Sequence, residues 1–275
     1  MNDRTSANYP KDFRTKWAGQ DYRYFEVTGS TNDDCIRFLQ EGAPHGTVVV
    51  SGAQTAGKGR RGRVWDSPPG EAVYMSVGLK PDFSPEKASM LTLVMALAVC
   101  RAIEDVAGDF ALAGEGEKFQ IKWPNDIVCG GKKVCGILTE MRVCTGKIEQ
   151  VVIGVGINVN CRSFAEEISR TATSLWQVTG TEFVCEDLIG RVLEQFEHYY
   201  EKFAEKCDMS TIMGEYVEKL VNVEKEVRVL DPRGEYTAVA LGINEQGELL
   251  VKKEDGTVAS VYAGEVSVRG IYGYV

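Results

Sequence analysis

The chain has 275 residues, enough for one large domain or for a main domain with a small appended one. Its 44% hydrophobic and 26% charged residues are typical of a globular protein with a buried core, and its net charge of −9 disfavours nucleic acid as a partner. The longest apolar run, 90–100, is too short to cross a bilayer, and the N-terminus lacks a secretory pattern. The eight cysteines include no C-x-x-C pair, so common zinc-ligand spacing is absent. We therefore expect a cytoplasmic protein with reduced cysteines, no metal site, and neither nucleic acid nor a membrane as partner.

The N-terminal half predicts alternating strands and helices. Polar residues dominate 1–20, which predicts a loosely ordered tail. Ser30 precedes a helical pattern that Gly42 ends, and Ser84 begins the clearest helical pattern of the chain. The remaining elements are expected as strands over 22–27, 47–54 and 72–79, with the second helix running from 84 to at least 102.

The C-terminal half predicts two kinds of structure. Strands are expected over 119–123, 132–141 and 148–155, with a turn at Gly130-Gly131, and helices over 184–206 and 210–220. After residue 221 the pattern changes to five short β segments separated by turn motifs, which predicts a small barrel of about fifty residues. We therefore place a domain boundary near 222, dividing the chain into 1–221 and 222–275.

A loop rich in glycine and arginine follows the second expected strand. The run Gly57-Lys58-Gly59-Arg60-Arg61-Gly62-Arg63 matches the G-x-G-x-x-G pattern of dinucleotide-binding turns. Such turns open into a helix, whereas Pro68-Pro69-Gly70 argues against a helix here, so that interpretation fails. Arginine donors suit phosphate or carboxylate oxygens, and like charges this close repel one another. We expect a mobile loop that orders around an anion; a solvated basic turn or a nucleic-acid patch are the alternatives.

Three more polar or glycine-rich segments stand at expected strand ends. They are Lys122-Trp123-Pro124-Asn125-Asp126, Lys133 with Gly136, and Gly154-Val155-Gly156-Ile157-Asn158-Val159-Asn160. Taken singly, each has a structural explanation: a turn capped by its own side chains, a solvated lysine, or a strand softened by glycine. Ideal strand geometry puts Lys133 and Gly136 on opposite faces unless the hairpin begins irregularly. Four such signals at strand ends together favour a binding site.

Together these motifs resemble the biotin protein ligase family from about Tyr24 to Arg269. Ser30-Thr31-Asn32 and Gln54 also stand where that family keeps its biotin-facing groups. The resemblance implies an α+β fold, with a catalytic domain like those of class II synthetases, a mixed sheet with flanking helices, and a C-terminal SH3-like β-barrel.

The resemblance also implies roles for individual residues. Lys133 and Arg60 are the implied catalytic residues. Biotin is assigned to Ser30, Thr31, Asn32, Gln54, Lys58, Gly59, Arg60, Lys133 and Gly136. ATP and the adenylate are assigned to Arg60, Arg61, Arg63, Trp65, Asn125, Lys133 and Asn158.

The implied activity is ATP-dependent ligation. Biotin and ATP form biotinyl-5′-AMP, with Mg²⁺ carried by the triphosphate, and biotin then passes to a lysine of a biotin carboxyl carrier protein of acetyl-CoA carboxylase or a related carboxylase. Asp126 is expected either to accept a proton or, with Asn125, to orient the ion. Many members have arginine in place of Lys58, which keeps the charge and loses the planar fork.

Other interpretations stay open beside this one. About twenty residues precede the expected catalytic domain, too few for the DNA-reading winged helix of some members, so no repressor role is expected; a homodimer is left open. One alternative is a lipoate or octanoate ligase or transferase of the same superfamily, whose Arg-Arg…Ser-Gly-Gly-Gly loop is missing here. The other is a non-catalytic module that binds biotin or nucleotide, although each essential position holds a competent residue.

Overall fold

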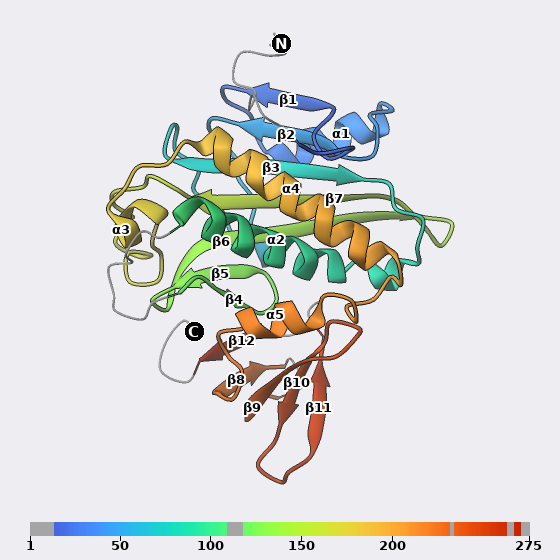
Figure 1. The fold of residues 1–275 in the computed structure, drawn as a ribbon, viewed down its shortest axis with the longest axis vertical. Coiled ribbons are helices and arrows are strands. Elements are labelled where there is room, and N and C mark those ends of the chain that lie inside the picture. The colour runs from blue at the N-terminus through green and yellow to red at the C-terminus, as the bar shows by residue number, and fades with distance from the viewer. Residues whose placement is uncertain (1–13, 109–117, 232–233, 263–266, 271–275) are drawn as a thin grey trace.

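A seven-stranded sheet forms the larger part of the molecule (Figure 1). The computed structural model describes residues 14–108, 118–231, 234–262 and 267–270. The strand order is β1-β2-β3-β7-β6-β5-β4; the β1–β2 pair is parallel and the other pairs are antiparallel, which confirms the predicted mixed sheet. The strands are β1 (Tyr22–Phe25), β2 (Thr47–Ser51), β3 (Ala72–Leu79), β4 (Gln120–Lys122), β5 (Asp126–Cys129), β6 (Lys132–Cys144) and β7 (Lys147–Asn158).

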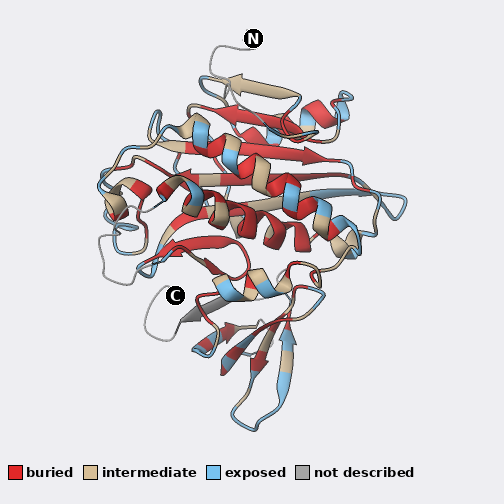
Figure 2. Cartoon of the chain, in the orientation of Figure 1, coloured by how far each residue is buried: buried red, intermediate tan, exposed pale blue. Residues whose placement is uncertain are grey.

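Helices flank this sheet. The long helices α2 (Met90–Ala107) and α4 (Cys185–Ala204) pack on each other over one face, and α1 (Thr31–Gln40) contacts β2, β3 and β7. Figure 2 shows α2 buried along most of its length, whereas α4 exposes a polar stripe, as expected for the outer helix of a layered domain. The shorter elements are α3 (Leu175–Thr179), α5 (Met213–Lys219) and the 3₁₀ turns η1 (Arg60–Gly62) and η2 (Pro85–Lys87).

The two faces of the sheet carry different side chains. In β7, Ile153 and Val155 belong to the large core beneath α2 and α4, whereas Val152 belongs to a smaller core beneath α1. Because side chains alternate along a strand, Gly154 and Gly156 face the α1 side. The α1 side therefore carries glycine where the opposite side carries branched aliphatic residues, and this leaves space above the central strands.

The predicted small C-terminal β domain, with its five short segments, is confirmed. Its strands form an antiparallel sheet in the order β11-β10-β9-β8-β12. Trp123 beside β4 donates its indole N–H to the carbonyl of Gly247 at 3.1 Å, which ties this domain to the larger one. The strands are β8 (Glu226–Leu230), β9 (Tyr236–Ile243), β10 (Leu249–Lys252), β11 (Val258–Val261) and β12 (Ser267–Gly270).

The expected N-terminal tail needs correction. Residues 1–13 lie outside the described part of the chain, but the following residues are held firmly. The carboxylate of Glu197 on α4 accepts the backbone N–H groups of Lys16, Trp17 and Ala18 at 2.7, 2.8 and 3.0 Å. Ala18 is fully buried. Hydrogen bonds to a buried carboxylate are strong, so the chain is anchored from residue 16 onward.

Two elements were missed and one begins late. The strand β5 begins at Asp126, the last residue of an expected turn, and continues through residues to which no element was assigned; the Gly130-Gly131 turn joins β5 to β6. The five-residue helix α3 was also not expected. The helix expected from Ser84 begins as the turn η2, and α-helix starts only at Met90. Proline at the first position of η2 agrees with the predicted start.

Candidate functional site

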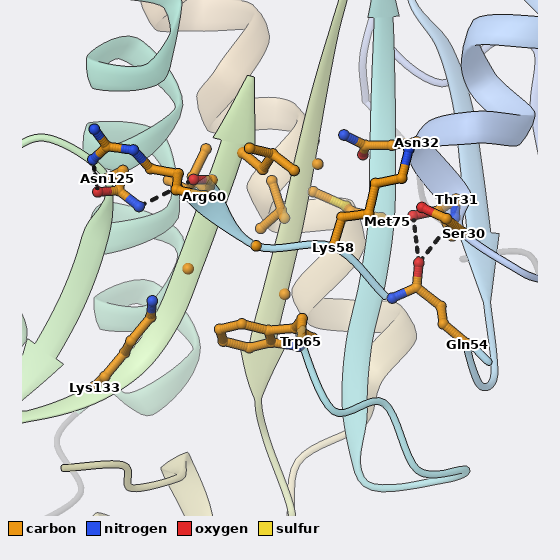
Figure 3. A pocket seen from close by; sticks show the side chains of 17 residues that line it. Ser30, Thr31, Asn32, Gln54, Lys58, Arg60, Trp65, Met75, Asn125 and Lys133 are labelled. Carbon is orange, nitrogen blue, oxygen red and sulfur yellow. Dashed lines mark hydrogen bonds between the residues drawn. The ribbon is translucent and has the colours of Figure 1, made fainter. Parts of the chain in front are cut away.

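A pocket opens between the N-terminal end of α1, the glycine-arginine loop and strands β3, β6 and β7 (Figure 3). It encloses about 460 Å³, part of which is open to solvent. Its lining residues are Ser30, Thr31, Asn32, Gln54, Lys58, Gly59, Arg60, Trp65, Met75, Asn125, Lys133, Gly136, Ile137, Leu138, Gly154, Val155 and Gly156.

One end of the pocket is polar and neutral. The backbone N–H of Thr31 donates to Oε1 of Gln54 at 2.9 Å, and Nε2 of Gln54 donates to Oγ of Ser67 at 3.0 Å. Ser30 stands at the N-cap position of α1, yet its side chain makes no capping hydrogen bond. Ser30 and Thr31 are each 3% exposed, so their hydroxyls lie in a largely dry environment. This end therefore suits a neutral group that offers both donors and acceptors.

The other end of the pocket is cationic. Nζ of Lys133 lies 2.6 Å from Oδ1 of Asp126, and the guanidinium of Arg60 donates to Oδ1 of Asn125 at 2.6 Å. Nδ2 of Asn125 donates to the same Asp126 oxygen at 3.1 Å, so the four side chains form one network. Two cations converge here with one carboxylate between them, which leaves this end suited to an anionic group.

A β-bulge brings Lys133 into the pocket. The register pairs Ile127 of β5 with Cys135 of β6 but the next residue, Val128, with Lys133, so β6 contains an extra residue here. A Cβ placed on Gly136 would lie 2.9 Å from Nζ of Lys133, so the two residues face the same side. The placement on opposite faces that ideal geometry predicts is therefore wrong, and the irregular hairpin start that the sequence argument allowed is present.

Trp65 lies between the two ends on a shelf of glycine residues (Figure 3). Gly136 and Gly156 are register partners, and a Cβ on either would come within 2.7 or 2.5 Å of the indole. Nζ of Lys133 lies 5.1 Å from the ring centroid, within the range of a cation–π contact. Only glycine lets a flat ring approach these strands so closely, so this part of the pocket suits planar groups.

Of the remaining loop cations, Lys58 lines the pocket and Arg61 and Arg63 do not. The ammonium of Lys58 lines the pocket and hydrogen-bonds the Asp33 carboxylate on α1, and this hydrogen bond raises the pKa of Lys58. Arg61 adopts φ +58 within η1, and Arg61 and Arg63 are both exposed. Exposed loops and residues with left-handed backbone are frequent at functional sites.

The structure brings most of the predicted site residues together. Every residue assigned to biotin lines the pocket, and so do Trp65 and Asn125. Arg61, Arg63 and Asn158 do not; Nδ2 of Asn158 donates instead to the carbonyl of Thr173 at 3.0 Å. The lining residues not assigned from sequence are Met75, Ile137, Leu138, Gly154, Val155 and Gly156. Apolar strand residues carry no local signal for a site, but glycine at alternate positions of β7 was such a signal.

The arrangement combines a neutral recognition end, a planar shelf and paired cations in one cavity. Cations that converge on one point can hold two anionic reactants together and stabilise the charge that builds between them. No group of three or more His, Cys, Asp or Glu side chains that could hold a metal ion occurs within the described residues. The same residues include no helix long and apolar enough to span a membrane.

Comparisons with known proteins identify the family of the chain. Residues 24–158 match the model of the Biotin/lipoate A/B protein ligase family, and residues 223–269 match the Biotin protein ligase C terminal domain. The chain is 35% identical over 257 residues to the bifunctional ligase/repressor BirA of Bacillus subtilis, covering 93% of this chain and 76% of the relative. It is 30% identical over 277 residues to a biotin--[acetyl-CoA-carboxylase] ligase of Mycobacterium tuberculosis, covering 97% and 98%.

A solved structure shares the whole architecture. The biotin protein ligase from Aquifex aeolicus, in complex with biotin and ATP, superimposes with a TM-score of 0.76 at 30% identity. The match covers 91% of this chain and 99% of the Aquifex chain. Identity at this level over both parts of the molecule shows the family as well as the fold. The chain belongs to the biotin protein ligase family.

Proposed function

We propose that this pocket converts biotin and ATP into biotinyl-5′-adenylate and then transfers the biotinyl group to a lysine of a biotin carboxyl carrier protein. The observation that carries the proposal is the polarity of one continuous cavity, neutral at the α1 end and cationic at the Lys133 end. Biotin has the same polarity, with a neutral ureido ring and a carboxylate tail. The similar biotin protein ligase from Aquifex aeolicus is solved in complex with biotin and ATP, which supports these two molecules as the ligands.

The polar end recognises the ureido ring. Ser30, Thr31 and Gln54 supply hydroxyl, amide and carbonyl groups, and the ring offers two N–H donors and one C=O acceptor. Because Ser30 and Thr31 are buried, a ligand that leaves one of their polar groups unpaired binds much more weakly. Specificity at this end therefore depends on hydrogen bonds and not on charge.

The cationic end brings two anions together. The biotin carboxylate attacks the α-phosphorus of ATP, and mutual repulsion of the reactants opposes this approach. Lys133 and Arg60 screen that repulsion and stabilise the charge on the pentacoordinate phosphorus. Lys58 and the backbone of Gly59 hold the carboxylate, and Trp65 supplies a planar surface on the nucleotide side. Pyrophosphate leaves, and the mixed anhydride remains.

The second step transfers the biotinyl group. A neutral lysine amine attacks the acyl carbon, AMP leaves, and the amine proton passes to Asp126 or to a phosphate oxygen. Asp126 Oδ1 lies 2.6 Å from Nζ of Lys133, which places its carboxylate beside the atoms that we propose react. Arg61 and Arg63 lie outside the pocket. We assign them to a lid that closes over the adenylate and excludes water.

Mg²⁺ enters this scheme on the triphosphate. The oxygens of Asp126 and Asn125 already have Lys133 and Arg60 as cationic partners, which argues against a resident ion held by this pair. When bound, the ion neutralises charge on the phosphates. Nδ2 of Asn158 donates to the carbonyl of Thr173, so contact with the nucleotide is left to its oxygen or its second N–H. Three statements remain predictions. They are that the carrier belongs to acetyl-CoA carboxylase or a related carboxylase, that the protein can form a homodimer, and that it does not bind DNA.

The test is transfer to a carrier. The purified protein is incubated with Mg·ATP, biotin and a biotin carboxyl carrier domain, and intact mass spectrometry measures the mass added to the carrier. We expect one biotinyl increment that depends on ATP. Acceptance of lipoate or octanoate in place of biotin would move the protein to the sister family. Binding of biotin without transfer of any acyl group would leave a binding module.

A further inference from the structure

Lys133 lies just beyond the part of β6 that pairs with β7. That pairing begins at Cys135, which faces Ile157 one residue before β7 ends. On the other side of β6, the bulge places Val134 opposite no residue of β5. The lysine whose ammonium we place in the chemistry therefore has no partner on β7, and its backbone needs another support on that side.

A separate segment takes the place of β7 beside Lys133. The backbone N–H of Lys133 donates to the carbonyl of Thr171 at 2.8 Å, and the carbonyl of Lys133 accepts the N–H of Thr173 at 2.9 Å. These two hydrogen bonds form a parallel bridge between Lys133 and Ala172. Residues 171–173, which we call the clamp segment, thus bind both backbone polar groups of the lysine.

Asn158, the last residue of β7, fastens the clamp segment. Its Nδ2 donates to the carbonyl of Thr173 at 3.0 Å, and the two residues are 9% and 4% exposed. A hydrogen bond in such a buried environment is electrostatically stronger than the same bond in water. A second fastening follows at the next residue: Ser174, which is fully buried, donates from Oγ to the carbonyl of Cys161 at 2.6 Å.

We propose that Asn158 is a positioning residue for Lys133, because through Thr173 it holds the backbone that carries the catalytic ammonium. The inference rests on the proposed function, in which Lys133 stabilises charge between the biotin carboxylate and the α-phosphorus. It adds a role for Asn158 beyond contact with the nucleotide. In this role, loss of the Asn158 side chain lowers the rate of adenylate formation and leaves the affinity for ATP nearly unchanged.

The side chain of Lys133 has little freedom to correct a shift of its backbone. Nζ lies 2.6 Å from Oδ1 of Asp126, and a Cβ on Gly136 would lie 2.9 Å from both Cε and Nζ. The end of the side chain is therefore held between a carboxylate and the backbone of a strand. Displacement of a catalytic group by about 1 Å can lower a rate about 10²-fold. A loosened clamp segment thus misplaces the ammonium without removing it.

The test is a double-mutant cycle of wild type, Asn158→Ala, Lys133→Ala and the double variant. Single-turnover release of pyrophosphate at saturating biotin and ATP gives the rate of adenylate formation, and calorimetry gives the dissociation constant of ATP. Asn158→Ala is expected to lower the rate about 10- to 50-fold, with ATP affinity within about threefold of wild type. In the Lys133→Ala background the same substitution is expected to change the rate less than about twofold, because the group that Asn158 positions is gone.

Two further variants sharpen the cycle. Asn160→Ala is the matched control: Asn160 also donates from Nδ2 to a backbone carbonyl, that of Phe183 at 2.9 Å, but it holds a different segment. This variant should keep the rate and the ATP affinity within about twofold of wild type. Ser174→Ala loosens the clamp segment from its other end. It is expected to lower the rate about 3- to 10-fold, again only while Lys133 is present, and it keeps the test decisive if Asn158→Ala is unstable.

Amide hydrogen exchange measures the clamp segment without any turnover. The N–H groups of Lys133 and Thr173 are both bound in the bridge. Their exchange is expected to be about tenfold faster in Asn158→Ala and unchanged in Asn160→Ala. This measurement needs neither biotin nor ATP, so its result does not depend on the proposed function.

Each outcome decides the proposal. A wild-type rate in Asn158→Ala, an equal fall with and without Lys133, or unchanged exchange at Lys133 overturns the positioning role and leaves the proposed function intact. Weaker ATP binding with an unchanged rate at saturation also overturns it, and makes Asn158 a nucleotide contact alone. A wild-type protein that forms no adenylate overturns the proposed function, and the exchange measurement then still decides whether Asn158 holds the backbone of Lys133.

Discussion

The two ends of the pocket are held in opposite ways. At the polar end, Thr31 and Asn32 lie on α1, and their side chains are buried and bonded to neighbouring protein groups. At the cationic end, Arg60 comes from a short 3₁₀ turn whose neighbours Arg61 and Arg63 are exposed. Groups fixed by packing are preorganised, whereas a loop cation must be ordered by its ligand. With the ligands placed as we propose, biotin enters a preformed site and the nucleotide orders the loop that completes its own.

Lys133 is the exception at the cationic end, because a paired strand holds it. If the two ends differ in rigidity as described, movement of the loop cannot compensate for the loss of the Lys133 side chain. Lys133→Ala is expected to lower the rate of adenylate formation about 10²- to 10³-fold, the size of effect found when one group that stabilises transition-state charge is removed. Release of pyrophosphate measures this rate. The neighbouring exposed Lys132→Ala is the control, and an equal loss in both variants would remove the special role of Lys133.

The polar end should tolerate no change of shape. A Cβ on Gly154 would lie 2.2 Å from Oδ1 of Asn32, so Gly154→Ala forces the carboxamide to move. We expect biotin binding to weaken about 10- to 100-fold through overpacking, with little change for ATP. Calorimetry with each ligand checks this. Gly214→Ala on α5, where a Cβ meets no atom within 4 Å, is the control. Unchanged biotin affinity in Gly154→Ala would show that the polar end is adaptable.

The sequence predicted the parts of the fold that local patterns encode. The strand β3 has the predicted bounds, 72–79, because its residues are mostly apolar and the turns around it are clear. The strand β5 was missed because Pro124, Asn125 and Asp126 predict a turn, and a four-residue strand is stabilised by pairing with β4 and β6 and not by its own propensity. Tertiary pairing overrode the local signal there.

The candidate site also had a part that the sequence predicted and a part that it did not. Motifs identified the residues that line the pocket, but not how they are oriented. The bulge that turns Lys133 toward Gly136 depends on the register of two strands. The bond from Asn32 to Glu140 joins residues 108 positions apart. Its partners are chosen by the packing of α1 on the sheet, and no local pattern of residues contains that information.

We expect the glycine-arginine loop to affect how long biotinyl-AMP stays in the pocket more than how fast it forms. Arg60→Gly removes the guanidinium and adds backbone freedom, while Lys133 stays on its strand. We expect adenylate to form still and to leave the pocket about tenfold faster, labelling exposed lysines of bystander proteins. Quenched-flow release of biotinyl-AMP and labelling of an added carrier-free protein measure this. If Arg60→Gly forms no adenylate and releases none, Arg60 acts only in catalysis, and the assignment of this loop as a lid is wrong.

One ion pair bridges the two ends, and the smallest effect is expected there. Lys58 in the loop hydrogen-bonds Asp33 on α1, and both side chains are substantially exposed, so the pair contributes about 0–1 kcal/mol. Asp33→Asn is therefore expected to speed adenylate release at most about fivefold, with Glu41→Gln at the far end of α1 as control.

The pH dependence of this bridge has a definite sign. The hydrogen bond to Asp33 raises the pKa of Lys58 above its ordinary value of 10.5, so the folded protein holds this proton more tightly than the unfolded chain. The stabilisation is fully present below pH 10.5 and is lost as the pH rises through the raised pKa. Release should therefore be the same from pH 7 to about 9.5 in wild type, and the difference between wild type and Asp33→Asn should disappear only above the ordinary lysine range. A difference that vanishes near neutral pH would mean that another group, and not Lys58, joins the loop to α1.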